Sequence, residues 1–308
     1  MKSRRDFIIQ SGLLAGGAMV LPACGSGSET KEAKKLPEQV VLKAKWNVGL
    51  QMYTLRNEIQ QDLEGTLRYV ADLGYNEVEL FGFRNGEYFG RPASEVHRMV
   101  KDLGMSIPSS HYLSGRTQEA QGMGTLKNGW DSAIEAAVDA GQTHMVIAYL
   151  FDGERETLDQ YSELEEMLNN AGEACKEAGI QLCYHNHAFE FEAIDGTLPM
   201  YHLLDNTDPN LLKVELDLYW VYKAGLDPLD FFKKYPGRTE LWHVKDIGDR
   251  GDDKDTTLEV GEGRIPFKDI FAAAGQSGLT NFFVEQDHSP NPKESVKLSL
   301  SRVKELLA

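Results

Sequence analysis

The chain has 308 residues, 41% of them hydrophobic, which is enough to build a sizeable core, and its formal net charge is −16. So acidic a surface repels phosphate groups, which argues against nucleic acid as a partner and against attraction to anionic lipid. The three cysteines, Cys24, Cys175 and Cys183, show neither the paired spacing of a zinc site nor a disulfide framework.

Residues 1–23 have the features of an export signal. Arg4 and Arg5 precede an apolar run over residues 9–20, which is too short to span a bilayer comfortably. The adjacent arginines resemble the signal of twin-arginine export, a route that moves folded proteins. We therefore expect export, and export in the folded state suits an enzyme that acquires a metal beforehand.

A lipid anchor is expected directly after this run. Residues 21–24 resemble a bacterial lipobox, in which Cys24 becomes the lipidated first residue after cleavage. Residues 24–45 are polar and small, which is typical of a flexible tether. We predict a periplasmic protein that is held to a bacterial membrane by this lipid only. An ordinary signal peptide with a chance cysteine is the alternative.

From residue 46 on, short apolar runs alternate with amphipathic stretches, which predicts one domain over residues 46–308. Strands are expected at residues 48–53, 77–80, 106–111, 145–149, 181–185, 213–216, 241–244 and 282–284. Helices are expected at residues 63–73, 93–103, 126–140, 158–178, 198–204, 228–234, 267–274 and 295–307. Residues 248–263 are expected to form a loop. Glycine follows several of the expected helices, as in connections from helix to strand: Gly74, Gly104, Gly141 and Gly179.

Eight strand–helix pairs are the number that closes a parallel barrel. We therefore predict an α/β fold, a single (β/α)8 TIM barrel, for which this chain length is normal. A doubly wound open sheet is the structural alternative, and it would usually carry a nucleotide loop near its first turn. The glycine-rich candidate at residues 260–264 lies late in the chain and lacks the third glycine of such a loop.

Polar side chains follow the expected strands at the end where barrel enzymes carry their active sites. The fifth to the eighth strand end in side chains of metal-ligand type: His185, Asp217, His243 and Glu285. Two imidazoles and two carboxylates suit Mn, Co, Zn or Fe better than Mg. The sequence therefore predicts one divalent metal at this rim of the barrel.

Two further residues share the faces of these ligands. His187 lies two residues after His185, so both imidazoles can face the barrel mouth. One can bind the metal while the other binds substrate or acts as an acid–base group. Lys245 lies two residues after His243 and can stabilise developing negative charge; a solvated position at the rim is its alternative.

Five segments carry a resemblance to a known family: residues 49–56, 184–191, 215–220, 243–246 and 284–287. Together they resemble the xylose-isomerase-like barrel superfamily, in its sugar phosphate isomerase and epimerase branch, over about residues 46–308. The resemblance implies a metal held by Glu, Asp, His and Glu after strands five to eight. Asp217, His243 and Glu285 match the last three positions, whereas His185 replaces the first glutamate.

This departure bears on catalysis, because two metal-bound glutamates serve the two faces of the substrate in ketose 3-epimerases of the superfamily. By the resemblance we expect Glu285 or His187 to abstract the proton and Lys245 to stabilise the anion. Trp220 replaces a histidine of those epimerases and offers a sugar an apolar platform. Contacts with the substrate are expected from Gln51, Glu79, His111, Glu190 and Trp220.

The resemblance implies a metal-dependent isomerase or epimerase that acts on a keto-sugar through an enediolate. Elimination from the same enediolate, by a lyase or dehydratase acting on 3-keto-glycosides or related sugars, is the alternative, and export favours glycosides over sugar phosphates. A non-catalytic sugar-binding lipoprotein is a further alternative. Endonuclease IV, a DNA-repair member, needs more ligands and a basic cleft. A small sugar is the expected partner, and a homo-oligomer stays open.

Overall fold

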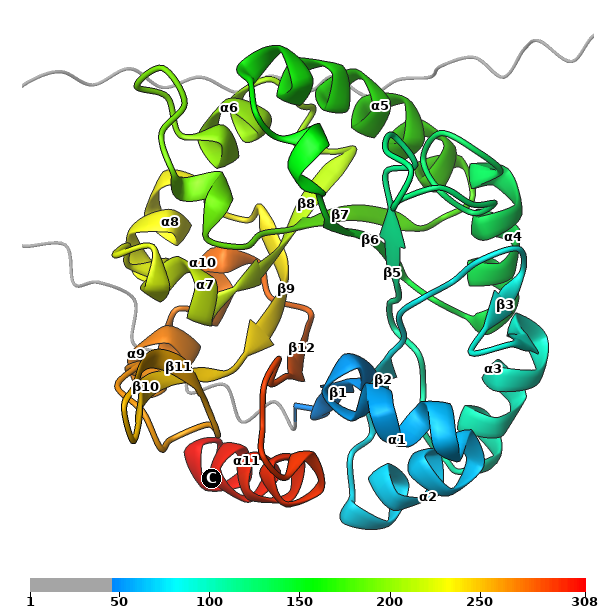
Figure 1. Ribbon diagram of the computed structural model, residues 1–308, viewed down its shortest axis with the longest axis vertical. Coiled ribbons are helices and arrows are strands. Elements are labelled where there is room, and N and C mark those ends of the chain that lie inside the picture. The colour runs from blue at the N-terminus through cyan, green and yellow to red at the C-terminus, as the bar shows by residue number, and fades with distance from the viewer. Residues whose placement is uncertain (1–45) are drawn as a thin grey trace, which may run out of the picture. The chain divides into compact units, whose positions relative to one another are not determined.

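The structure, a computed structural model, describes residues 46–308, and eight short parallel strands form its centre (Figure 1). The strands are β1 (Gly49–Gln51), β2 (Glu77–Glu79), β5 (His111–Leu113), β6 (His144–Tyr149), β7 (Gln181–His185), β8 (Leu212–Asp217), β9 (Thr239–Val244) and β12 (Asn281–Val284). Their order in the sheet is β2-β1-β12-β9-β8-β7-β6-β5. Isolated parallel bridges, Glu77–Ser106 and Leu80–Ser110, link the β2 region to the segment before β5. The predicted (β/α)8 barrel is confirmed.

Helices lie outside the ring of strands (Figure 1). They are α1 (Arg56–Gln61), α2 (Leu63–Leu73), α3 (Ala93–Asp102), α4 (Trp130–Ala140), α5 (Leu158–Glu177), α6 (Pro199–Asp205), α7 (Leu218–Lys223), α8 (Pro228–Lys234), α9 (Phe267–Ala272), α10 (Ala274–Ser277) and α11 (Pro292–Leu306). Short 3-10 turns follow three of the strands: η1 (Met52–Leu55), η2 (Asp152–Glu154) and η3 (Phe189–Phe191). The apolar face of each longer helix packs on the barrel, as Leu67 and Val70 of α2 do, and this burial drives the fold.

Local capping signals define where the longer helices begin and end. The carboxylate of Asp62 accepts a hydrogen bond from the backbone N–H of Gly65 at the start of α2. Gly74 ends this helix with a φ of +95°, a conformation that glycine adopts at low cost. Thr157 and Gln160 form a reciprocal capping box at the start of α5. These local contacts explain why both helices begin where the sequence predicted.

The third barrel strand differs from the strand predicted at residues 106–111. β5 begins only at His111, and the preceding segment pairs through isolated bridges on either side of Pro108. Proline has no N–H group to donate to a sheet ladder. The carbonyl of Pro108 instead accepts hydrogen bonds from the backbone N–H groups of Thr143 and His144.

A hairpin occupies much of the region predicted as a loop at residues 248–263. It consists of β10 (Asp246–Arg250) and β11 (Asp253–Leu258), which pair antiparallel. The buried carboxylate of Asp246 folds the connection after the hairpin back onto β10. It accepts hydrogen bonds of 2.8–3.0 Å from the backbone N–H groups of four residues: Ile247, Gly261, Gly263 and Ile265. Some of these hydrogen bonds join residues up to 19 positions apart, which a local sequence pattern does not reveal, so the hairpin was not predicted.

Replacing Gly172 with alanine is expected to destabilise the protein, although alanine is the better helix former. Gly172 lies in α5, where an added Cβ would meet the backbone oxygen of Leu211 at 2.8 Å. Overpacking of this kind costs about 1–3 kcal/mol. Gly275 in α10 is the matched control, because nothing in the described part of the chain lies within 4 Å of its added Cβ. Urea denaturation should show destabilisation for Gly172→Ala and none for Gly275→Ala; equal effects would contradict this account.

The predicted targeting features fall on residues 1–45. The signal peptide, the lipidation of Cys24 and the tether lie outside the described residues, so they stay predictions, as does the periplasmic location. Within residues 46–308, the structure contains no helix long and apolar enough to cross a membrane.

Candidate active site

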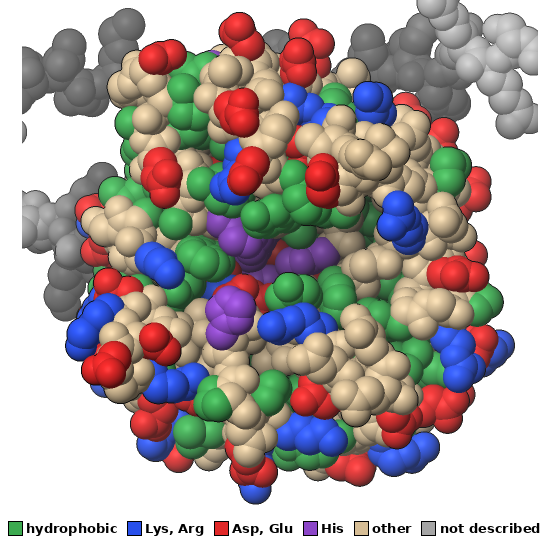
Figure 2. Space-filling view, in the orientation of Figure 1, with side chains coloured by type: hydrophobic (Ala, Val, Ile, Leu, Met, Phe, Trp, Pro, Cys, Tyr) green, Lys and Arg blue, Asp and Glu red, His purple; other side chains and the backbone are tan. Residues whose placement is uncertain are grey.

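The carboxyl ends of the barrel strands surround a cavity of about 940 Å³. Figure 2 shows histidine side chains (purple) gathered in a hollow on this face, with hydrophobic side chains (green) along its rim. Aromatic residues form much of the lining: Tyr53, Phe81, Phe83, Tyr149, Phe151, Phe189 and Trp220. The polar part of the lining includes His111, His185, His187, Glu285 and Asp287. A concave site with apolar, aromatic walls and a few converging polar groups is typical of small-molecule binding.

Four side chains from different strands form what we name the histidine cluster: His111, His185, Glu215 and His243. Each offers one ligand atom, and these atoms lie within 4.8 Å of one another. Oε2 of Glu215 lies 2.8 Å from Nε2 of His111 and 3.1 Å from Nδ1 of His185. The same oxygen lies 3.2 Å from Nε2 of His243. Three imidazoles therefore converge on one carboxylate at the end of the barrel.

A second group, the lysine cluster, lies beside it and consists of Lys245, Asp217, Glu285 and Asp287. The ammonium nitrogen Nζ of Lys245 is 2.8 Å from Asp217, 2.5 Å from Glu285 and 2.7 Å from Asp287. Burial opposes the charge of Lys245, but the three carboxylates raise its pKa well above the ordinary value. Asp217 also caps α7, because its Oδ1 accepts the backbone N–H of Trp220 at 3.0 Å. Lys245 is thus a buried, fully paired cation.

His243 connects the two clusters. Its Nδ1 lies 2.9 Å from Oε2 of Glu285, and its Nε2 lies 2.6 Å from Oε2 of Glu79. Burial opposes protonation, but the carboxylates of Glu215, Glu285 and Glu79 raise the pKa of His243 well above its ordinary value. Burial likewise opposes the cation at His111, yet Glu79 and Glu215 raise its pKa to about 9. The raised pKa values favour protonation of His111 and His243, which offsets the charge of the carboxylates around them.

The histidine cluster fits a divalent metal. Among the described residues, neither Nδ1 of His185 nor Oε1 of Glu215 has a hydrogen-bond partner, although both atoms are buried. Buried polar atoms are rarely left unpaired, so both atoms are free to bind a ligand. Imidazole and carboxylate donors suit Zn, Fe, Co or Mn better than Mg. Metal binding here would displace the protons that the imidazoles carry.

The four predicted metal ligands lie close together, but the structure divides them between the two clusters. His185 belongs to the histidine cluster, whereas Asp217, His243 and Glu285 form a second group whose ligand atoms lie within 4.8 Å of one another, with Lys245 beside Asp217 and Glu285. Sequence reasoning missed Glu215 as a donor. The signal was available, since Glu215 lies two residues before Asp217 on β8 and therefore faces the same side of the sheet.

His187 lines the cavity as a neutral imidazole. Its ring stacks on Phe189, with the centroids 5.4 Å apart and the planes 3° from parallel, and lies 5.3 Å from the ring of Trp220. Burial, followed by the charge of Lys245, lowers the pKa of His187 to about 3. A neutral imidazole on the cavity wall can accept a proton from a bound substrate.

Three residues that were predicted to contact substrate are fully buried behind the cavity lining: Gln51, Glu79 and Glu190. The side-chain amide of Gln51 donates to Glu79, whose carboxylate in turn contacts His111 and His243. Glu190 accepts hydrogen bonds from the hydroxyl of Tyr184 and the backbone N–H of His187, both at 2.7 Å. These residues position the histidines, whereas His111 and Trp220 do line the cavity.

Replacing Glu190 with glutamine is expected to stabilise the protein relative to the wild type as the pH rises. Burial raises the pKa of Glu190 to about 7, against the hydrogen bonds that favour its charged form. A raised carboxyl pKa gives stability that is present below the ordinary value and lost as the pH rises to 7. The difference in unfolding free energy should therefore change by roughly 3 kcal/mol at most between pH 4.5 and 7. Chemical denaturation at several pH values measures it, and a constant difference would contradict the assignment.

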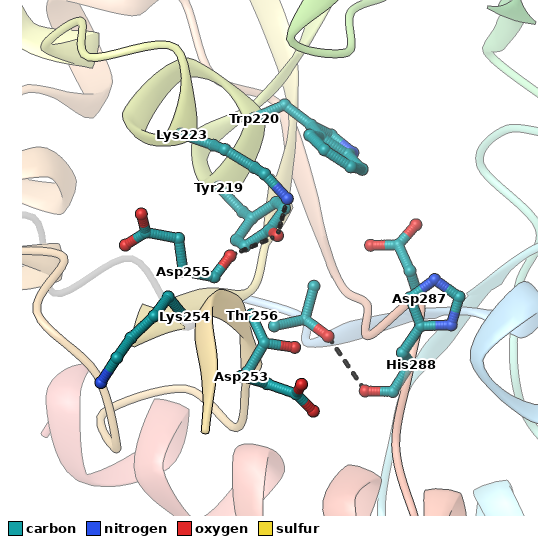
Figure 3. A pocket seen from close by; sticks show the side chains of 10 residues that line it. Tyr219, Trp220, Lys223, Asp253, Lys254, Asp255, Thr256, Asp287 and His288 are labelled. Atoms are coloured by element: carbon teal, nitrogen blue, oxygen red, sulfur yellow. Dashed lines mark hydrogen bonds between the residues drawn. The ribbon is translucent and has the colours of Figure 1, made fainter. Parts of the chain in front are cut away.

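A smaller cavity of about 290 Å³ adjoins the large one beside the β10–β11 hairpin (Figure 3). Figure 3 shows Lys223 and Trp220 on one side of it and Asp287 and His288 on the other. These four residues line both cavities. The hydroxyl of Tyr219 donates to the backbone oxygen of a hairpin residue at 2.9 Å, which holds the hairpin in place. The two spaces together exceed what one sugar ring fills.

The fold and the clustered donors define a TIM barrel with a metal-binding type of site at the carboxyl ends of its strands. Residues 67–306 match the family described as xylose isomerase-like TIM barrel. The chain belongs to this family, and the resemblance stated from the sequence motifs is confirmed.

Several proteins that are similar to this chain are named as enzymes. An inosose dehydratase of Lacticaseibacillus casei is 28% identical over 156 residues, which cover 45% of this chain. The match spans about half the length of that relative, 52%. A sugar phosphate isomerase/epimerase from Parabacteroides distasonis is 29% identical, with a TM-score of 0.72 over 88% of this chain and 99% of the other. The IOLI protein, solved with a bound zinc atom, has a TM-score of 0.66 over 85% of this chain and 98% of its own, but its 11% identity shows the fold alone.

Proposed function

We propose that this protein is a divalent-metal-dependent enzyme that removes a proton next to the carbonyl group of a keto-sugar and returns it, as an isomerase or epimerase does. The observation that carries this proposal is the histidine cluster, four donors from four strands that meet at the cavity of a xylose isomerase-like barrel. The named relatives, a dehydratase and an isomerase/epimerase, support a sugar or a related polyol ketone as substrate.

The residues around the cavity have different roles in the proposed reaction. A bound divalent metal supplies Lewis acidity, which lowers the pKa of a C–H group next to a carbonyl. His187 faces the cavity with a neutral imidazole, so it is placed to accept the proton and return it, although burial and the charge of Lys245 lower its pKa and weaken it as a base. Lys245 is an ammonium group beside Glu285 and balances negative charge that develops on the substrate. Glu285 is the weaker base. Burial raises its pKa, but the positive charges of Lys245 and His243 have the larger effect and lower the pKa below its ordinary value.

Elimination is the second candidate, and two observations favour it. The relative from Lacticaseibacillus casei is a dehydratase, a class of enzyme that expels a group from the substrate. The main cavity, at about 940 Å³, lies near the upper end of the roughly 300–1,000 Å³ of small-molecule sites, and a side cavity adjoins it. This space suits a keto-glycoside, whose second group leaves after the proton is removed.

One experiment tests the proposal and separates the two reactions. The metal-loaded protein is incubated with ketoses and keto-glycosides in deuterated water and followed by NMR. Isomerisation or epimerisation appears as deuterium next to the carbonyl and a new sugar, and elimination appears as loss of the leaving group. His187→Gln should slow the reaction by about 10²–10⁴-fold, whereas His202→Gln, where α6 meets α5 and away from both clusters, should not. Sugar binding without either reaction would refute the proposal and favour a sugar-binding protein.

A further inference from the structure

The two clusters at the end of the barrel compete for the same imidazole. His243 belongs to the histidine cluster and also contacts Glu285 of the lysine cluster, and its ring has only one lone pair available when the other nitrogen carries a proton. Nε2 faces the histidine cluster, 3.2 Å from Glu215, and Nδ1 faces the lysine cluster, 2.9 Å from Glu285. A neutral His243 can therefore serve a metal on one side only.

The lysine cluster already contains a cation. Nζ of Lys245 lies within 2.8 Å of one oxygen each of Asp217, Glu285 and Asp287, and its side chain is 0% exposed. A divalent ion bound to Asp217 and Glu285 would lie next to this ammonium group in a buried site, where charge repulsion is strong. The second oxygen of Asp217 is also engaged, because it caps α7.

The hydrogen bond on the other nitrogen selects the side on which His243 can bind a metal. When Nδ1–H donates to Glu285, the lone pair of Nε2 is left on the side of Glu215, 3.2 Å away, where it is available to a metal. Metal-binding histidines commonly donate their second N–H to a carboxylate in this way. Glu79 also lies 2.6 Å from Nε2, and hydrogen bonds from Gln51 and Ser109 hold it there.

Buried atoms without hydrogen-bond partners occur in both clusters of the described chain, but Oδ2 of Asp217 and of Asp287 lie 2.8 and 2.7 Å from the ammonium group of Lys245. Within residues 46–308, Nδ1 of His185 and Oε1 of Glu215 are buried and make no hydrogen bond, and both side chains are at most 3% exposed. Together the three imidazoles and Glu215 provide three nitrogens and one carboxylate oxygen that lie within 4.8 Å of one another. This donor set is suited to zinc and its neighbours in the first transition row.

We propose that the divalent metal binds to His111, His185, Glu215 and His243, and that the ammonium group of Lys245 takes the place of a metal between Asp217 and Glu285. This assignment rests on the proposed function only in requiring a metal, and on no particular substrate. It differs from the ligand set implied by the family resemblance, in which Asp217 and Glu285 bind the metal directly. The lysine cluster then holds His243 in the metal-binding tautomer and supplies a fixed positive charge beside the substrate.

The test measures metal binding directly on the full chain, by elemental analysis after dialysis and by titration with Co²⁺ followed by visible absorption. Wild type should bind one ion, with the intense absorption of a four-coordinate Co²⁺ site. His111→Ala should lose the ion at concentrations that saturate the wild type. Asp217→Asn should keep it, with an affinity lowered by about 10–100-fold at most, as for an outer partner. Retention by His111→Ala with loss by Asp217→Asn would overturn the assignment.

Lys245→Gln provides a second, opposite readout. Removing the ammonium group frees three carboxylates, so this variant should bind two ions per chain instead of one. Lys213→Gln is the matched control, because Lys213 also pairs with a barrel carboxylate, Glu240, yet contacts neither cluster, and it should still bind one ion. A single ion in Lys245→Gln, with unchanged Co²⁺ absorption, would also count against the proposal. Binding as expected without turnover of any sugar would refute the proposed function but leave the metal assignment standing.

Discussion

Replacing Lys245 with methionine is expected to lower the free energy of unfolding by about 3–5 kcal/mol, the usual cost of removing one partner from a buried ion pair. The side chain of Lys245 is fully buried, and its ammonium group lies within 2.8 Å of three carboxylates. Without it, Asp217 and Glu285 would repel each other in a site that is largely buried. The measurement is urea denaturation of wild type and variant at pH 7, with metal removed from both.

The pH dependence separates this electrostatic cause from a loss of packing. Lys245 and His243 lower the pKa of Glu285 against the effect of burial, so in the wild type this carboxylate stays charged at low pH. In the variant the carboxylates can fold in the protonated form, so the difference in stability should shrink as the pH falls. Lys233→Met, at an exposed pair with Asp230, should leave stability unchanged. A Lys245→Met protein as stable as the wild type at pH 7 would disprove the role assigned to this lysine.

Replacing His243 with alanine is expected to reduce kcat/KM by roughly 1,000-fold, the rate equivalent of the several kcal/mol that Lewis-acid catalysis supplies. His243 belongs to both groups of ligand-type residues at the end of the barrel, so its loss removes a metal donor under either assignment of the ligands. It also leaves Glu285 and Glu79 without their hydrogen-bond partner. Activity would be measured on whichever keto-sugar the NMR panel identifies.

A chelator provides the matching measurement on the wild type. Removing the metal should reduce activity to the level of His243→Ala, and adding Zn, Co, Mn or Fe should restore the wild type but not the variant. His144→Gln is the control, because His144 is also a buried histidine paired with a glutamate, Glu240, at the start of β6. It should keep both metal and activity. Full activity of chelated protein would show that the reaction needs no metal.

Much of the barrel could be predicted from local patterns. The bounds predicted for α2, α8 and β7 are those observed, because each element has a clear apolar period and a capping residue or glycine at its end. The interruption before β5 was less visible, since the pairing around Pro108 depends on neighbouring strands. The β10–β11 hairpin was missed for a similar reason, because Asp246 organises residues up to 19 positions away.

The candidate site was also predictable in part. Ligand-type residues after successive strands indicated where a metal would bind, and the structure places His185, Asp217, His243 and Glu285 at this end of the barrel. It did not follow from the sequence that Glu215 would meet His111, because the two residues are 104 positions apart on β8 and β5. Gln51, Glu79 and Glu190 were expected at the cavity but lie behind its lining, where they hold the histidines in position.

By itself the sequence determined the barrel and the end of the barrel at which polar residues gather, since these depend on periodicity and caps within about ten residues, and the resemblance of five short segments indicated the family. The tertiary structure decided which side chains share a cation. Lys245 reaches Asp217 on β8 and Asp287 beyond β12 only because strands distant in sequence become neighbours when the barrel closes. Distances of a few ångströms between such residues set the charges of the site, and no local pattern contains them.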